Sequence, residues 1–264
     1  MTTLLSYLGR NQLAFTAYLG QLTFLAWDTV VSMATAPIRW KLALSQMLEV
    51  GYRSQLVVVV TGGFTGAVFA AQTYFQFHSL GMDSAVGAVV AVSMFRELGP
   101  VLTGLMVAGR VGAAMSAEIG TMKVTEQIDA LRALGVYPTD YLVVPRAIAM
   151  MVSMPLLVAE CVACGILVGY FVGVVLLDIP GTYYVHNMMK FTGLRDLKMA
   201  LTKGFFFAII IVLVSCHQGL NAKEGAAGVG RAPTEAVVIG SLAILISNFF
   251  LTLILQVIFP YGSG

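Results

Sequence analysis

The 264-residue chain is far more apolar than a soluble protein, since 58% of its residues are hydrophobic and its mean hydropathy is +0.88. Only 11% of the residues are charged, whereas a soluble domain carries about 25%. This composition excludes a soluble enzyme, a nucleic-acid-binding domain and a disordered chain, and a net charge of +2 does not indicate a polyanionic partner. The sequence predicts an all-α polytopic membrane protein with length for five or six spanning helices.

The first 50 residues are less apolar than the rest of the chain. Residues 11–38 carry one charge, Asp28, together with several Asn, Gln and Thr residues, and their apolar residues recur at helical spacing. This pattern favours a helix that lies in the cytoplasmic interface, with a sixth membrane span as the alternative. We therefore expect an N-terminal interfacial helical segment over 1–50 and a five-span membrane domain over 51–264.

Runs nearly free of charge predict the five spans. Each run is long enough to cross about 30 Å of hydrocarbon at 1.5 Å per residue, although the fourth is marginal. Three cysteines, Cys161, Cys164 and Cys216, lie in apolar stretches, a placement that argues against a disulfide framework. The predicted spans are 55–82, 84–109, 147–177, 204–222 and 236–264.

Lys and Arg residues are distributed unequally over the connections between these spans. Ten lie on the side of the N-terminus, and four lie on the opposite side, all in the third connection. By the positive-inside rule the N-terminus is cytoplasmic and the C-terminus is external. The external four are Lys190, Arg195, Lys198 and Lys203, in a segment that we expect to contain an interfacial helix.

Glycines recur at four-residue intervals inside two of the spans. Gly62 and Gly66 form such a pair in the first span, and Gly165, Gly169 and Gly173 form a row in the third. Small residues in this pattern let helix backbones approach closely inside a membrane. They predict helix packing within one protomer, or alternatively a seam between two copies.

Two adjacent charges, Arg96 and Glu97, lie in the middle of the second span, and Glu160 stands alone in the third. A charge at the centre of a spanning helix costs about 2.5–3.5 kcal/mol on insertion scales, so it needs a partner, a wet cavity or a function. Pro100 is expected to bend or break the helix at this point. We interpret Arg96 and Glu97 as a polar wall of a substrate cavity or as a structural lock between helices.

The connection between the second and third spans predicts a short cytoplasmic helix at about 120–135. Thr121 can begin it, Gly135 can end it, and Pro138 prevents its continuation. Its apolar stripe needs a surface to pack on, and a groove on a soluble partner or the bilayer surface can supply one. The stripe consists of Val124, Ile128, Leu131 and Gly135.

The order of residues from Asp129 to Arg146 resembles the coupling loop of ABC permeases, where a short helix docks into the ATPase. The chain itself contains no G-x-x-x-x-G-K-[ST] phosphate-binding loop. It also lacks H-E-x-x-H and G-x-S-x-G, so we expect no enzyme activity, catalytic residue, metal site or cofactor in this chain.

The run from Arg96 to Leu131 contains the pieces RELGPV, AGR, AEIG and TEQ in that order. It resembles the signature of the MlaE/YrbE permease family. The resemblance implies a permease subunit of an ABC system that moves phospholipid or a related lipid between the inner and outer membranes of bacteria. It further implies an inner-membrane homodimer with a separate cytoplasmic ABC ATPase, a periplasmic MCE-domain protein and in some systems a STAS-domain protein, with the C-terminus in the periplasm.

The same resemblance implies two sets of functional residues. A lipid-binding pocket would be lined by Phe69, Gln76, Phe77, Leu80, Arg96, Glu97 and Leu98. Contacts with the ATPase would involve Glu118, Thr125, Glu126, Ile128, Asp129, Leu131 and Arg132.

Two rival functions stay open at this point. An ion- or proton-coupled secondary transporter could use Glu97 and Glu160, although such transporters are expected to contain inverted repeats, which this sequence lacks. A membrane scaffold without a transport cycle is the other alternative.

Overall fold

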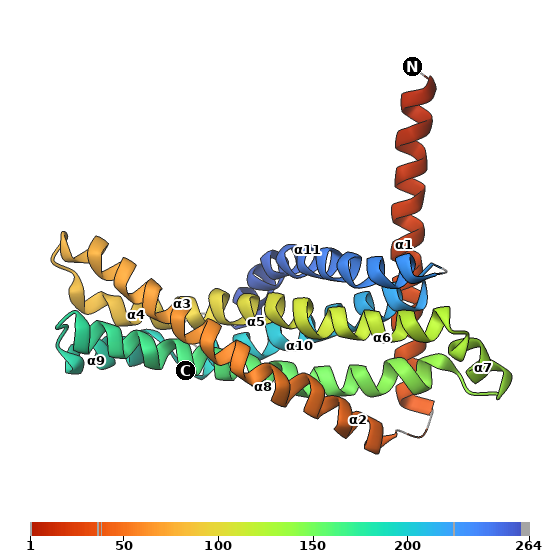
Figure 1. The fold of residues 1–264 in the computed structure, drawn as a ribbon. Coiled ribbons are helices and arrows are strands. Elements are labelled where there is room, and N and C mark those ends of the chain that lie inside the picture. The colour runs from red at the N-terminus through yellow and green to blue at the C-terminus, as the bar shows by residue number, and fades with distance from the viewer. Residues whose placement is uncertain (1, 36, 38, 224, 260–264) are drawn as a thin grey trace.

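The structure, a computed structural model, describes residues 2–35, 37, 39–223 and 225–259, and within them every regular element is a helix (Figure 1). The α-helices are α1 (Thr2–Thr35), α2 (Trp40–Met47), α3 (Arg53–His78), α4 (Val86–Ser93), α5 (Gly99–Val107), α6 (Ala113–Val124), α7 (Gln127–Ala133), α8 (Val144–Phe171), α9 (Gly181–Phe191), α10 (Leu194–Leu220) and α11 (Ala226–Ile258). Shorter turns join them: the 3-10 turn η2 (Asp83–Ala85) and the π-helical turns η1 (Leu48–Tyr52), η3 (Met94–Leu98), η4 (Ala108–Gly112), η5 (Thr139–Val143) and η6 (Val172–Leu176).

Five continuous helical segments of the described residues are long and apolar enough to cross a membrane, which confirms the predicted number of spans. α1 is not one of them, and α2 and η1 continue directly into α3. The division of the chain at residue 50 stays a prediction. The five segments are Trp40–His78, Asp83–Val124, Thr139–Leu176, Leu194–Leu220 and Ala227–Ile258.

The spans form an elongated bundle, with α7 at one end and α9 at the other (Figure 1). We call these the α7 end and the α9 end. α1 runs across the bundle near the α7 end, and its N-terminal part extends beyond the other helices. It is held there by polar contacts: Gln21 Oε1 lies 3.1 Å from His217 Nε2, and the Ser32 hydroxyl donates to the Asp140 carboxylate.

The glycine rows pack α3 against α8 inside a single chain. A Cβ on Gly66 would lie 2.0 Å from the Gly165 carbonyl oxygen, and one on Gly62 would lie 2.6 Å from the Cys161 carbonyl oxygen. The backbones therefore touch where a side chain would separate them, as small residues allow in membrane helices. These glycines therefore pack helices within one protomer, which is the first of the two predicted uses.

Candidate functional site

The second span is distorted where the sequence predicted it, and the distortion takes the form of the π-helical turn η3. In an α-helix the amide of residue 100 would donate to the carbonyl of Arg96, but Pro100 has no amide hydrogen. The Lys203 ammonium on α10 donates to the Arg96 carbonyl instead, at 2.5 Å. A side chain from another span thus satisfies a backbone acceptor at the proline, as an apolar environment requires.

Lys203 connects three helices at this point. Its side chain is 0% exposed, and Nζ donates to Glu97 Oε1 at 3.0 Å and to Thr252 Oγ1 on α11 at 2.8 Å. With the Arg96 carbonyl, all three ammonium hydrogens have acceptors. Asn248 Nδ2 donates to Glu97 Oε2 at 2.7 Å, and Thr252 Oγ1 lies 2.9 Å from Glu97 Oε1. We call Glu97, Lys203, Asn248 and Thr252 the Glu97 cluster.

A second ion pair lies beside the Glu97 cluster. Arg96 Nε donates to Asp196 Oδ1 at 2.7 Å, and the other carboxylate oxygen of Asp196 accepts from the Gly193 amide at 3.0 Å, where α10 begins. Both opposite-charge pairs join the second span to the fourth. Each charge has a partner, which is how membrane proteins retain ionisable residues, yet Glu97 keeps a side-chain exposure of 41%. The carboxylate can therefore also face a ligand.

The predicted lipid-binding residues outside this pair of charges divide into two groups. Phe69, Phe77 and Leu98 are partly buried and pack around one hydrophobic core cluster, formed by residues of α3, α4, η3, α8, α9 and α10 and by Ile179. Gln76 and Leu80 are exposed at the α9 end of the first span. The structure thus brings three of these residues together and leaves the other two at the surface; the binding role of all five stays a prediction.

Sequence reasoning missed four polar residues that complete the site. Lys203 was assigned to the third connection, but α10 begins at Leu194, so it lies inside the span. Their spacing could have indicated that they lie together, because Asp196 and Lys203 are seven residues apart and share one face of α10. Asn248 and Thr252, four residues apart in an otherwise apolar helix, likewise share a face of α11.

The predicted cytoplasmic helix at 120–135 consists of two elements in the structure. α6 continues to Val124, and the Thr121 hydroxyl donates to the Ala117 carbonyl within it, so Thr121 does not begin a helix. Glu126 then takes a left-handed conformation, with φ +58°, and α7 follows. Gly135, with φ +73°, ends α7 as predicted, since its left-handed conformation favours glycine.

The apolar stripe of this connection packs on the protein itself. Ile128 is 1% exposed in the main core cluster, and Leu131 packs against that cluster. The expectation that a partner covers the stripe is therefore corrected for Ile128, whereas Leu131 stays partly exposed and its contact with the ATPase stays a prediction. Thr125, Glu126, Asp129 and Arg132 are exposed, and so are Leu134, at 78%, and Tyr137, at 75%. Glu118, also exposed, pairs with the buried Arg146 at 2.8 Å.

Comparisons with known proteins bear on both regions. The sequence matches the model of a family described as "Permease MlaE" over residues 43–254, which include the Glu97 cluster and α7. A Rickettsia felis protein named "Probable ABC transporter permease protein" is 43% identical over 244 residues, which is 92% of this chain and 94% of that protein. A Synechocystis protein of similar name is 42% identical over 229 residues, 87% of each chain. The Arabidopsis thaliana protein "TRIGALACTOSYLDIACYLGLYCEROL 1, chloroplastic" is 35% identical over 240 residues, 91% of this chain and 67% of that protein.

Proposed function

The chain belongs to the MlaE family of ABC transporter permeases, and from this premise we propose that it moves a phospholipid or related lipid between the inner and outer membranes of a bacterium. The observation that carries the proposal is the Glu97 carboxylate, which is fixed by Lys203 and Asn248 yet partly exposed within a spanning helix. A lipid headgroup could bind there while apolar side chains hold its acyl chains. The Arabidopsis relative is named after a lipid, which supports this class of cargo.

Two copies of the chain would form the transport unit. The exposure of α11 supports this. In its most apolar 18-residue stretch only 11% is buried, against 61% in the corresponding stretch of α10. Leu245, Phe249 and Leu253 are exposed on one face of α11, next to the face that carries Asn248. A second copy on that face would enclose the space in front of Glu97.

An ABC permease works with an ATPase, and we place the ATPase contact on the exposed surface around α7, with the N-terminus in the cytoplasm. Glu126, Asp129 and Arg132 supply charge there, and Leu134 and Tyr137 supply apolar contact. Interfaces of this kind combine an apolar centre with a polar rim. An MCE-domain protein would then meet the α9 end, in the periplasm.

Co-purification of the chain with its ATPase tests this contact. Leu134→Asp should abolish co-purification because it puts a charge into the apolar centre of the interface. Leu194→Asp is the matched control, since Leu194 is 76% exposed at the α9 end, against 78% for Leu134. Normal assembly of Leu134→Asp would remove this surface from the mechanism.

Transfer of a fluorescent phospholipid from proteoliposomes that contain the complex tests the transport function. Transfer should require ATP and should fall at least tenfold in Glu97→Gln when equal amounts of folded complex are compared. Transfer driven by a proton gradient without ATP would instead support the ion-coupled alternative. In that alternative Glu160 would also be needed, although it makes none of the hydrogen bonds of the Glu97 cluster.

A further inference from the structure

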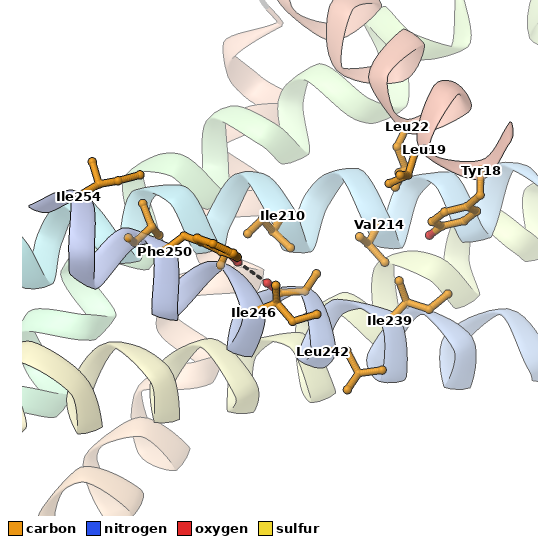
Figure 2. A pocket seen from close by; sticks show the side chains of 13 residues that line it. Tyr18, Leu19, Leu22, Ile210, Val214, Ile239, Leu242, Ile246, Phe250 and Ile254 are labelled. Carbon is orange, nitrogen blue, oxygen red and sulfur yellow. Dashed lines mark hydrogen bonds between the residues drawn. The ribbon is translucent and has the colours of Figure 1, made fainter. Parts of the chain in front are cut away.

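An apolar groove with a volume of about 840 Å³ runs between α1, α10 and α11 (Figure 2). None of the predicted lipid-binding residues lines it. Its walls are almost entirely hydrocarbon, and its two polar side chains are engaged: the Ser247 hydroxyl donates to the Ala243 carbonyl, and the Tyr18 hydroxyl accepts from Gln218 at 3.4 Å. Burial raises the pKa of Tyr18, so its hydroxyl stays neutral. A polar molecule would lose its hydrogen bonds in this groove, whereas a hydrocarbon chain would not.

The groove is separate from the Glu97 cluster. At 3.6 residues per turn, Asn248 and Thr252 project from one face of α11. The groove-lining residues Leu242, Ile246 and Phe250 project from a sector centred roughly on the opposite face. A molecule in the groove would therefore not touch Glu97, and the two sites can be tested independently.

The length of the groove suits an acyl chain. It extends along α11 from Ile239 to Ile254 (Figure 2), which is about 22 Å at 1.5 Å per residue. One leaflet of a bilayer is about 15 Å deep in hydrocarbon. The groove is therefore long enough to hold an acyl chain that runs parallel to the spans over the full depth of its leaflet.

A basic pocket adjoins the groove at its α7 end. Gln218, which donates a hydrogen bond to the groove residue Tyr18, lines this second pocket together with Lys223, Arg231 and Glu235. Two cations and one anion at this position favour a negatively charged group. The glycine-rich segment lies here: Gly225 precedes α11, and residues 226–230 form the first turn of that helix.

We infer that the groove and the basic pocket together bind one anionic phospholipid of the leaflet at the α7 end, with an acyl chain along α11 and the phosphate near Lys223 and Arg231. The apolar groove lies beside the basic pocket, just as the acyl chains of such a lipid lie beside its phosphate. Because α1 forms one wall, the bound lipid would also hold α1 against α10. The inference requires only that the five spans lie in a bilayer, and it does not rest on the proposed transport function.

Phosphatidylglycerol with a photoreactive group on its acyl chain tests this site in nanodiscs that contain the full chain. Labelled peptides identified by mass spectrometry should come mainly from α1, α10 and α11, and unlabelled phosphatidylglycerol should compete better than phosphatidylethanolamine. Ala243→Phe fills the groove and should reduce labelling at least tenfold. Ala163→Phe is the matched control, since Ala163 is exposed on α8 outside the groove, and it should leave labelling of the groove unchanged.

The basic pocket has its own variant, which removes an exposed charge and so preserves folding. Arg231→Gln should weaken competition by phosphatidylglycerol about fivefold, as expected for one cation at a membrane surface. Lys198→Gln, an exposed cation near the α9 end, should have no effect. Even labelling of all lipid-facing helices, unchanged labelling in Ala243→Phe, or complete disulfide cross-linking of two copies through Ile246→Cys would overturn the inference. Loss of lipid transfer with normal labelling of the groove would refute only the transport function.

Discussion

The ion pair between Glu97 and Lys203 predicts unequal costs for two substitutions that each remove one charge. Glu97→Gln leaves the Lys203 ammonium, which is 0% exposed, without its counter-charge. Breaking a buried ion pair from one side costs about 3–5 kcal/mol. We expect about 4 kcal/mol of stability to be lost, because the ammonium keeps the Arg96 carbonyl and Thr252 as partners but cannot reach water.

Lys203→Met should cost about half as much. The Glu97 carboxylate it leaves behind is 41% exposed and still accepts hydrogen bonds from Asn248 and Thr252. Water can therefore replace the lost ammonium, and partly exposed ion pairs contribute little to stability. The unpaired Arg96 carbonyl accounts for most of the remaining cost, which we put at about 2 kcal/mol.

Reversible unfolding in mixed micelles, followed by tryptophan fluorescence and circular dichroism, measures both costs. The double variant should lose less stability than the two single variants lose together, by at least about 2 kcal/mol, because neither uncompensated charge is then left. A greater loss in Lys203→Met than in Glu97→Gln, or simple additivity, would refute the reasoning from burial.

Two glycines give further predictions. Gly66→Ala should destabilise the chain by about 1–3 kcal/mol, because its Cβ would lie 2.0 Å from the Gly165 carbonyl oxygen and would force α3 away from α8. The control in the same unfolding assay is Gly240→Ala, whose added Cβ has no heavy atom within 4 Å. Gly135→Ala places a side chain at φ +73° and should cost about 1 kcal/mol. Faster amide hydrogen exchange in α7, with unchanged exchange in the spans, would verify this, and equal exchange would contradict it.

The number of spans could be predicted because the bilayer imposes a local requirement. Each spanning helix must be apolar over about 20 consecutive residues, and this is visible in the sequence without knowledge of its neighbours. The ends were harder to predict, because helices continue past the membrane where charges are permitted. The second span was predicted over 84–109 but forms part of the helical segment Asp83–Val124.

The candidate site was only half predictable for a different reason. Arg96 and Glu97 are conspicuous in an apolar run, and Pro100 explains the distortion next to them. Their partners are distant in sequence, since Glu97 and Lys203 are 106 residues apart. A charge pattern shows that a partner must exist but does not identify it. The stripe of α7 failed similarly, because amphipathicity shows that Ile128 must be buried but not whether a partner or the chain itself buries it.

The geometry of the second span links the two regions that the proposed mechanism requires. From Gly99 to Val124 the helix continues through η4 for about 39 Å, with the Glu97 cluster at one end and α7 at the other. Ile128 fixes α7 to the core, so a displacement of α7 would act on the core and on α6 rather than on a loose loop. At the other end, Lys203 and Asp196 tie the span to α10 by charge. A force applied by the ATPase would therefore reach Glu97 through a continuous helix and would act on its hydrogen bonds with Asn248 and Thr252 of α11.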